Sequence, residues 1–359
     1  MNEINRKYLG KEPYSYSGKQ RVYENFPNKT KSKIDEALSY NDIYTRFRQH
    51  KKSNKYSPIY VYNKRELFQS DITFFTADHL VKANNGYKYL HCTIDVFTKM
   101  AWVYPLKSNN CKNTLTCFKD ILKQCGKKPE RLQSDRGSEF KCLKFKKFLK
   151  DNDIHHYFSY SYRKCAVIER FNLSIQQLLY KLMAKNNSYE WTKFLDQAMQ
   201  IYLNRKHTTI QMSPIDAEKG ENQNKIRKIY HSKYEEAAIN VKKPKYKVGD
   251  TVRIWSERSK FHRGYMEDFS REYFTIIEVL SNLPVPRYKL SDINGENIIG
   301  SFFEDEIIRY NVQPNQYYDI EKVIKERGKG SNKELFVKYK GWPNSFNEWV
   351  NASNVKNIK

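Results

Sequence analysis

Residues 67–204 carry a succession of apolar patterns that few folds can satisfy. Leu67–Ala77, Tyr87–Phe97 and Met100–Leu106 are rich in β-branched and aromatic residues and predict three strands, the last two close enough for a hairpin. The pattern then predicts, in order, a helix at Cys111–Cys125, a strand at Arg131–Ser134, a helix at Leu143–Lys150, a strand at Ile154–Phe158 and helices at Ile168–Lys185 and Tyr189–Asn204. This order indicates an α/β domain, a mixed five-stranded sheet with helices packed on its faces.

The regions on either side differ from this one in composition and in the pattern of their apolar residues. Residues 1–66 are polar and basic, with one helical candidate near Ser32–Arg48, and are interpreted as an N-terminal extension. Residues 244–312 contain short alternating strands joined by Gly, Asn and Pro turns, which is typical of a small all-β barrel. Residues 317–359 follow a Pro-Asn-Gln stretch as a last module. The sequence therefore predicts a multidomain chain divided into 1–66, 67–225, 244–312 and 317–359.

The charge of the chain points to a polyanionic partner. Lys and Arg number 65 against 40 Asp and Glu, a formal net charge of +25. Cations placed near phosphates release condensed counterions, so such an excess favours nucleic acid. A Lys-rich surface without a partner is the alternative. No apolar run approaches the ~20 residues of a membrane span, and the polar start does not resemble a secretory leader, so no membrane partner is expected.

The cysteines do not form a recognisable metal motif. All six lie between residues 92 and 165, and none forms a C-x-x-C pair. We therefore expect no zinc site, and we expect the cysteines to be reduced thiols.

Three acids occupy positions that a mixed sheet brings together. Asp71 lies within the first predicted strand, Asp135 just past the fourth, and Glu169 opens the helix after the fifth. Clustered carboxylates repel one another unless cations neutralise them, and their hard oxygens select Mg²⁺ or Mn²⁺; two such ions can act at a phosphorus centre. The alternative is a purely structural role for two of the acids. Asp135 would then cap a turn with Gly137, and Glu169 would be a favourable residue at the start of a helix. Asp71 resists that reading, because an unpaired carboxylate in an apolar strand is expensive.

The segments around these acids resemble a known family. FQSDITFF, NGYKYLHCTIDVFTKMAWVYPLKS, LQSDRGSEF and VIERFNLSIQ together resemble retroviral-type integrases, most closely those of Maverick/Polinton DNA transposons and the related virophages. The resemblance implies an RNase H-like core. It assigns the catalytic, metal-binding DDE triad to Asp71, Asp135 and Glu169 and leaves Asp95 outside the triad as a structural residue. Glu139 is interpreted as a helix-start acid.

The resemblance also implies surfaces that contact DNA. The upstream zinc-binding HHCC motif of the family is absent here, and residues 244–312 resemble the family's SH3-like C-terminal domain. The expected DNA-binding residues are Arg163, Lys164, Arg170 and Asn172 near the triad, and Lys245, Lys247, Arg253, Arg258, Lys260 and Arg263 in the barrel. A solvated barrel face is the alternative for the second group.

The last module resembles a chromodomain, a small α+β fold. YDIEKVI, LFVKYKGW and NEWV occur in the order that this family shows. The resemblance places a methyl-lysine cage at Tyr318, Tyr339 and Trp342, where a cation would lie against aromatic faces. The alternative is that these rings only pack a small sheet, and that reading is adopted for Trp349.

These features predict the integrase of a DNA mobile element or virophage. The expected activity is a polynucleotidyl transfer with two Mg²⁺ or Mn²⁺ ions: 3′-end processing of element DNA, then strand transfer into host DNA. The expected partners are double-stranded DNA, further copies of the chain and a methylated histone tail. The expected location is the host nucleus, with packaging in a virion as a second site. Two alternatives are a catalytically silent chromatin or DNA tether and an RNase H-type nuclease.

Overall fold

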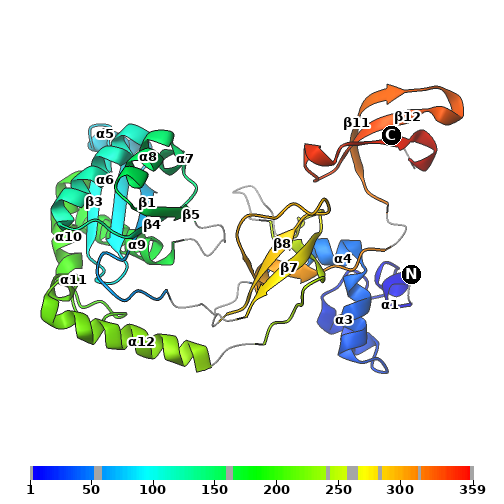
Figure 1. Cartoon of the computed structure of the whole chain (residues 1–359), viewed down its shortest axis with the longest axis horizontal. Helices are drawn as coiled ribbons and strands as arrows, with labels where there is room; N and C mark the ends of the chain where they lie inside the picture. Colours follow the sequence, from blue (N-terminus) through cyan, green and yellow to red (C-terminus); the bar gives the residue numbers. More distant parts are fainter. Residues whose placement is uncertain are drawn as a thin grey trace. The chain divides into compact units, whose positions relative to one another are not determined.

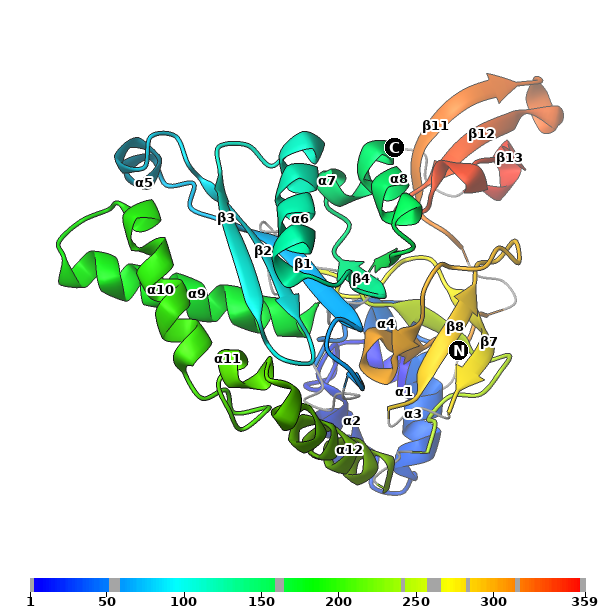
Figure 2. The ribbon, with the colours of Figure 1, turned by 60° about the vertical axis from the view of Figure 1, so that its left-hand side comes forward.

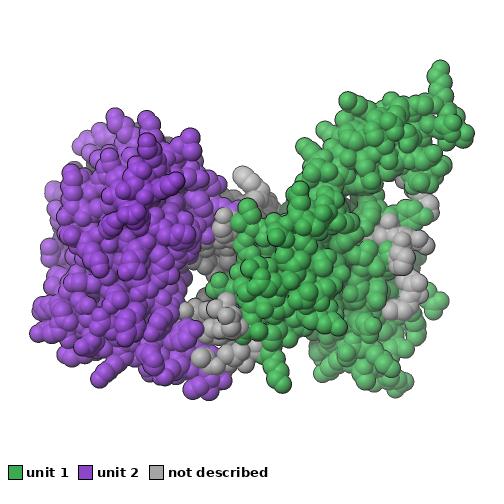
Figure 3. Space-filling view, in the orientation of Figure 1, with its two compact units in different colours: residues 1–56, 241–359 green, residues 57–240 purple. Residues whose placement is uncertain are grey.

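The computed structural model describes residues 3–51, 59–158, 165–239, 243–256, 266–281, 285–313 and 317–355. The chain divides into two compact units, one of residues 57–240 and one that combines residues 1–56 with 241–359 (Figure 3). Within the described ranges, no helix has both the length and the apolar character that a bilayer crossing requires.

The unit of residues 57–240 is built on a five-stranded sheet. Its strands are β1 (Leu67–Phe74), β2 (Tyr89–Asp95), β3 (Ala101–Leu106), β4 (Arg131–Ser134) and β5 (His155–Phe158), in the order β3-β2-β1-β4-β5. The strand β2 pairs antiparallel with β1 and β3, whereas β4 pairs parallel with β1 and β5. The predicted mixed sheet is confirmed.

Helices cover both faces of this sheet (Figures 1 and 2). On one face lie α6 (Cys111–Cys125), α7 (Ser138–Lys141) and α8 (Leu143–Asp151), and on the other lie α9 (Ala166–Lys185), η1 (Trp191–Phe194) and α10 (Leu195–Asn204). Phe68 and Ile72 of β1 pack toward the first group, with Phe118 and Phe145. The second face buries β2 side chains against the apolar stripe of α9. The helices α6, α8, α9 and α10 each bury an apolar stripe, as their spacing predicted, whereas α7 was not predicted.

Four other helices of this unit were not predicted. They are α5 (Asp78–Ala83), α11 (Pro214–Ala217), η2 (Gly220–Asn222) and α12 (Gln223–Ile239). The helix α12 buries Ile226 and Tyr230 against Val61, Val96 and Phe97. Only a narrow part of α12 is apolar, which explains why its sequence gave a weak signal.

The other unit contains four N-terminal helices. They are α1 (Glu3–Tyr8), α2 (Lys19–Asn25), α3 (Lys31–Ser39) and α4 (Asp42–Phe47), and they share a small core that includes Tyr8, Val22, Ile34, Leu38 and Tyr44. The single helix expected near Ser32–Arg48 is divided in two. The reason is local: the Asn41 side chain accepts a 2.9 Å hydrogen bond from the Tyr44 amide and starts α4 afresh.

A second five-stranded sheet lies in the same unit. Its strands are β6 (Thr251–Ile254), β7 (Phe274–Leu280), β8 (Arg287–Ser291), β9 (Phe302–Phe303) and β10 (Ile307–Arg309), all antiparallel in the order β10-β6-β7-β8-β9. The short turn η3 (Glu304–Glu306) joins the last two.

The N-terminal helices dock against the region of this sheet. The Asp268 amide donates to the Arg46 carbonyl at 3.0 Å. The Asn311 side chain donates to Ser39 Oγ at 2.7 Å. Residues 3–51 are therefore part of a folded unit with the second sheet and do not extend from it as a separate arm.

The last described segment is a three-stranded antiparallel sheet. Its strands are β11 (Ile320–Arg327), β12 (Glu334–Tyr339) and β13 (Glu348–Asn351). The turns η4 (Gly330–Asn332), η5 (Asn344–Phe346) and η6 (Ala352–Asn354) accompany it, and residues 317–355 contain no α-helix. The α part of the expected α+β module is thus not found in the described residues.

One cysteine pair corrects the expectation of thiols throughout. Cys111, at the start of α6, and Cys142, which precedes α8, form a disulfide with their Cα atoms 6.1 Å apart. The packing of α6 against α7 and α8 brings the two cysteines together, which their separation of 31 residues does not predict.

Candidate active site

The three predicted acids lie on the predicted elements. The parallel register of β1 and β4 pairs Ser70 with Ser134, so Asp71 and Asp135 follow aligned positions on neighbouring strands. Asp71 pairs across β2 with Cys92, which belongs to the core beneath α9. Glu169 lies in the first turn of α9. The topology therefore directs the three positions to one end of the sheet.

The electrostatics of Asp71 show that these carboxyl groups act on one another. Its pKa is raised from 3.8 to about 7, first by burial and then by the negative charges of Asp135, Glu169 and Glu139. A carboxyl group that is buried beside like charges retains its proton to higher pH. A cation bound among the four groups would relieve the same repulsion.

Two contacts hold the first two acids in place. The Asn172 side-chain amide donates to Asp71 Oδ2 at 2.9 Å. The Gly137 amide donates to Asp135 Oδ1 at 2.9 Å. Asn172 Oδ1 is buried and, within the described part of the chain, has no hydrogen-bond partner.

The donor chemistry of this cluster fits Mg²⁺ or Mn²⁺. Asp71, Asp135 and Glu169 offer only hard oxygen donors, and the buried carbonyl oxygen of Asn172 lies beside them. The side chains are not drawn together into a closed ligand set, because no group of three or more His, Cys, Asp or Glu residues in the described ranges has metal-binding spacing.

Glu139 contributes a fourth carboxylate that the sequence reading did not assign to the site. Its place in the first turn of α7 confirms the helix-start interpretation. In addition, burial and the charge of Asp135 raise its pKa. A Cβ at Gly137 would lie 2.6 Å from the Glu139 carboxylate, so only glycine lets this carboxylate lie against the turn. The spacing Asp-x-Gly-x-Glu was the signal available in the sequence.

Asp95 has the structural role that was predicted for it. It is fully buried, accepts from the amide of Phe97 and the hydroxyl of Thr98, and forms a 2.9 Å ion pair with Arg65. These contacts close the β2–β3 turn and leave Asp95 outside the acidic cluster.

The predicted DNA-binding residues divide into three groups. Arg163, Lys164, Arg258, Lys260 and Arg263 lie outside the described residues. Arg170, Lys245 and Lys247 are exposed, as a phosphate contact requires. Asn172 and Arg253 are buried, and for these two the structure corrects the expectation of an exposed DNA contact.

The correction for Arg253 has a clear physical reason. Its guanidinium donates to the carbonyls of Ser270 and Arg271 at 2.7 Å each and to Asp42 Oδ1 at 2.6 Å. It also lies 3.8 Å from the centre of the Tyr310 ring. All these partners are internal, so Arg253 joins α4 to the second sheet and is not an exposed cation. The amide of Asn172 is likewise used by Asp71.

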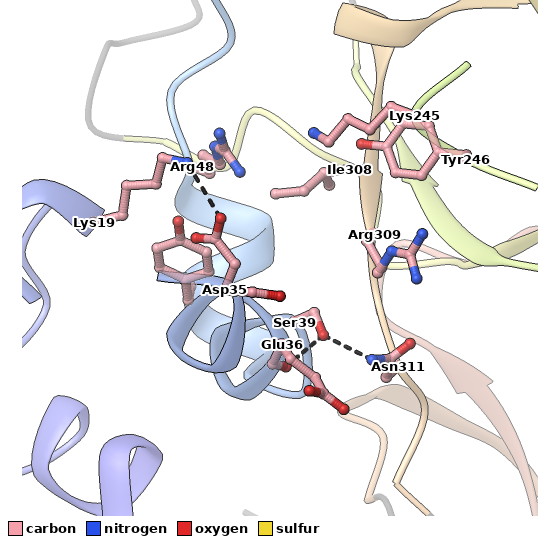
Figure 4. Close-up of a pocket in the computed structure, with 12 residues that line it drawn as sticks. Lys19, Asp35, Glu36, Ser39, Arg48, Lys245, Tyr246, Ile308, Arg309 and Asn311 are labelled. Atoms are coloured by element: carbon pink, nitrogen blue, oxygen red, sulfur yellow. Dashed lines mark hydrogen bonds and ion pairs between the residues drawn. The ribbon is translucent and has the colours of Figure 1, made fainter. Parts of the chain in front are cut away.

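A pocket of about 340 Å³ lies between α2–α4 and the second sheet (Figure 4). Basic and acidic side chains both line it, among them Lys19, Asp35, Arg48, Lys245 and Arg309. Lys19 pairs with Asp35 at 3.5 Å, and Arg309 pairs with Asp250 at 2.6 Å. Four basic and two acidic residues line the pocket, and two of the basic residues are already paired with carboxylates. None of the three predicted catalytic acids lines it.

The three aromatic residues expected to form a cage do come together. The Tyr318 ring lies 5.9 Å from Tyr339 and 5.4 Å from Trp342 between centroids, and is steeply inclined to both. These are contact distances, so the rings fill the space between them. Tyr273, which precedes β7, lies edge-on to Trp342 at 5.8 Å, and Trp342 is only 8% exposed. The cluster is closed in this structure.

A family model, several known proteins and several solved structures match parts of this chain. Residues 62–164 match the family model described as "Integrase core domain". A transposon-derived protein of Caenorhabditis elegans is 27% identical over 217 residues, which are 60% of this chain and 72% of that protein. The Pro-Pol polyprotein of feline foamy virus is 29% identical over 126 residues, 34% of this chain and 11% of the polyprotein.

A solved structure extends the likeness in fold. A chain of the simian T-cell lymphotropic virus intasome, determined in complex with the PP2A regulatory subunit B56 gamma, has a TM-score of 0.55 at 14% identity. The likeness covers 87% of this chain and all of that one. Residues 62–164 thus carry a retroviral-type integrase core domain with an integrase-like RNase H fold, related to transposon-derived and retroviral sequences.

Proposed function

We propose that this chain is the integrase of a DNA mobile element of the Maverick or virophage type. It processes the 3′ ends of the element and transfers them into host DNA. The observation that carries the proposal is the geometry of one end of the sheet, where Asp71 and Asp135 follow paired positions of β1 and β4 and Glu169 lies in the first turn of α9. Residues 62–164, which include both aspartates, match an integrase core domain. An acidic cluster of this kind can hold divalent cations, and such cations stabilise the negative charge that develops on oxygen at a phosphodiester.

The chain supplies the ligands and the positions for this chemistry. Asp71 and Asp135 would hold one Mg²⁺ or Mn²⁺, and Glu169 with one of these aspartates would hold a second. When bound, such ions activate the attacking oxygen and stabilise the leaving oxygen. Asn172 orients Asp71, and the Gly137 amide orients Asp135. Water is the attacking group in end processing, and the resulting 3′-hydroxyl is the attacking group in strand transfer.

DNA binding is proposed to rest on exposed cations. Arg170 lies next to Glu169 on α9, and Lys245 and Lys247 precede the second sheet, which we propose to be the SH3-like domain. Contacts to phosphate oxygens fix register and carry little sequence information. Two DNA ends must meet one target, so the active form is proposed to be a homo-multimer that works in the host nucleus.

The sheet β11-β12-β13 is proposed to be a chromodomain that selects chromatin as the target. The meeting of Tyr318, Tyr339 and Trp342 supports a methyl-lysine site. A methylammonium needs room among the rings, and the closed cluster offers none. Binding of a methylated histone tail therefore requires Tyr318 to rotate away from Trp342.

Two other functions use the same fold without strand transfer. A catalytically silent tether would bind DNA but would not need carboxylates at all three positions. A nuclease of the RNase H type would cut but would not join, and would not need the two additional sheets. Retention of Asp71, Asp135 and Glu169 favours the integrase over the tether.

The deciding experiment follows labelled DNA carrying the termini of the element together with a supercoiled target plasmid. The wild-type protein with Mg²⁺ is expected to trim the ends and join them to the plasmid. Glu169→Gln should abolish both steps while DNA affinity persists, because the exposed cations are unchanged. Asp196→Asn is the matched control, since Asp196 is also an exposed acid in the first turn of a core helix.

Each alternative has its own outcome. Cutting without joining would identify a nuclease. Binding without either step would identify a tether. Wild-type transfer by Glu169→Gln would remove Glu169 from the proposed triad.

A further inference from the structure

Gln69 connects β1 to the start of α9 through a fully buried side chain. It lies two residues before Asp71 and has no exposed surface. Its Oε1 accepts hydrogen bonds from the amides of Val167 at 3.1 Å and Ile168 at 3.0 Å. Its Nε2 donates to Gln133 Oε1 at 2.8 Å. Every polar atom of the Gln69 side chain is thereby engaged.

The two amides are those that a helix normally offers to its own N-cap. The helix α9 begins at Ala166, so Val167 and Ile168 occupy its second and third positions. An N-cap side chain usually accepts from one of these two amides. The residue at the N-cap of α9 is Cys165, whose thiol is a weak acceptor. Gln69 supplies the capping oxygen from 98 residues away.

The partner of Gln69 repeats its position on the neighbouring strand. The tripeptide Gln-Ser-Asp occurs at residues 69–71 and again at residues 133–135. The register of β1 and β4 pairs Gln69 with Gln133, so the two glutamines face each other directly behind the two aspartates. Gln133 accepts the hydrogen bond from Nε2 of Gln69, and this fixes the orientation of the Gln69 side-chain amide. The carbonyl oxygen of that amide therefore points to α9.

We propose that Gln69 is a positioning residue that fixes Glu169 relative to Asp71 and Asp135, with Gln133 orienting the Gln69 amide. This inference rests on the proposed function. The capped turn, Val167 to Ile168, lies immediately before Glu169, so a shift of the helix start moves the third acid. The second contact between α9 and the strand, from Asn172 to Asp71, lies on the far side of Glu169. Glu169 thus lies between two contacts with β1, the paired hydrogen bonds to Gln69 and the single hydrogen bond from Asn172 to Asp71.

The chain provides a control with the same structural role in another place. Asn84 is also a buried amide that starts a helix in trans: its Oδ1 accepts from the amide of Thr192 at 2.9 Å. Its Nδ2 donates to the carbonyls of Leu80 and Tyr189. Asn84 belongs to the η1 region and has no contact with the acidic cluster. Loss of its cap should destabilise the same unit without displacing Glu169.

The test compares Gln69→Met, Gln69→Glu, Gln133→Met and Asn84→Leu in the full-length protein. Hydrogen exchange is measured at the first turn of α9, together with single-turnover strand transfer and Mn²⁺ affinity by calorimetry. Gln69→Met should accelerate exchange at Val167 and Ile168. It should also lower the maximal transfer rate and the Mn²⁺ affinity by about 10- to 100-fold, the usual cost of losing an outer contact to a ligand. Half-saturation by DNA ends should stay within about twofold, because the DNA-binding cations are untouched.

The other variants separate positioning from general stability. Gln69→Glu keeps an acceptor for α9, and a flipped Gln133 amide can donate to it, so exchange protection and rate should recover in large part. Gln133→Met should give an intermediate loss. Asn84→Leu should lower the unfolding temperature as much as Gln69→Met and yet keep the transfer rate and Mn²⁺ affinity within about threefold.

Three results would overturn the inference. Unchanged hydrogen exchange at Val167 and Ile168 in Gln69→Met would show that Gln69 does not cap α9. Wild-type rate and Mn²⁺ affinity in that variant would remove the positioning role, and equal losses in Asn84→Leu would reduce it to general stability. If the wild-type protein neither cuts nor joins DNA, the proposed function fails, and the exchange and Mn²⁺ measurements still decide the role of Gln69.

Discussion

The side-chain amide of Asn172 donates a 2.9 Å hydrogen bond to the Asp71 carboxylate and so joins α9 to β1 at the acidic cluster. Asn172 lies three residues after Glu169, almost one helical turn, so both project from the same side of α9. Asn172 and the backbone amide of Ile72 donate hydrogen bonds to Asp71, whereas the charges of Asp135, Glu169 and Glu139 repel its carboxylate. Asp71 is therefore the residue at which the charge state of the whole cluster can be followed.

Asp71 should make the metal-free protein less stable as the pH rises. Its pKa is raised from 3.8 to about 7 in the folded protein, so the folded state holds a proton that the unfolded chain has released. The free energy of unfolding is therefore highest, as far as Asp71 affects it, below about pH 4. It falls as the pH rises toward 7, by up to about 4 kcal/mol in total. Asp71→Asn should flatten the dependence. Urea unfolding in EDTA at pH 5 and pH 8 measures it, with Asp196→Asn as control; equal slopes in wild type and Asp71→Asn would contradict the assignment.

Divalent cations should reverse that loss. Binding of Mg²⁺ or Mn²⁺ among the carboxylates requires Asp71 to be ionised, so addition of metal should release protons and restore stability near pH 8. Strand transfer should stop in EDTA and should survive a zinc-selective chelator, because the described residues contain no Cys/His cluster for zinc. Calorimetry in two buffers of different ionisation enthalpy counts the protons. Unfolding of α1–α4 by the zinc chelator would reveal a site of another kind.

Arg253 and Lys247 should behave in opposite ways when replaced. Arg253→Met removes three internal hydrogen bonds and leaves Asp42 without this partner, which should cost about 2–4 kcal/mol of stability. Lys247→Ala changes an exposed side chain and should cost less than about 0.5 kcal/mol. It should instead weaken DNA binding and reduce the dependence of log K on log salt by about 1. Unfolding curves and anisotropy titrations in increasing salt give both quantities, and a stable Arg253→Met that loses DNA binding would return Arg253 to the DNA surface.

The aromatic cluster should discriminate methylated lysine only after it opens. Tyr273→Ala removes the ring that lies against Trp342 and should strengthen binding of a trimethyl-lysine histone peptide relative to the unmodified peptide. Trp342→Ala should remove a preference of about tenfold, the scale of several cation–π contacts. Trp349→Ala is the control, because Trp349 packs on Phe336 and Arg327 instead. If wild type and Tyr273→Ala each bind both peptides equally, the three rings only pack the small sheet and do not recognise methyl-lysine.

Local signals explain which parts of the fold could be predicted. Both ends of α6 agree with the sequence, because Asn110 caps it with a 3.0 Å hydrogen bond and Gly126 ends it at a φ of 66°. The positions of Asp71, Asp135 and Glu169 followed from the order of strands and helices. The helix α12 was not predicted, because so few of its residues are apolar.

Contacts between distant segments explain what could not be predicted. The local sequence around Arg253 predicts a surface cation. Its burial depends on a contact with Asp42, which lies 211 residues earlier in the chain. The trans cap of α9 by Gln69 leaves no trace in the local sequence of the helix. The disulfide between Cys111 and Cys142 depends in the same way on how α6 packs against α7 and α8.

The hydrogen bond between Ser39 and Asn311 also sets an order of events during synthesis. It spans 272 residues, and the entire 57–240 unit lies between its two ends in the sequence. At translation rates of about 5–20 residues per second, α3 waits roughly 15 to 55 seconds for its partner. The 57–240 unit is complete on the ribosome within that interval, so it can fold while the helices before it still lack their partner sheet. A chain released before residue 311 would carry a complete 57–240 unit together with N-terminal helices that lack part of the surface they pack against.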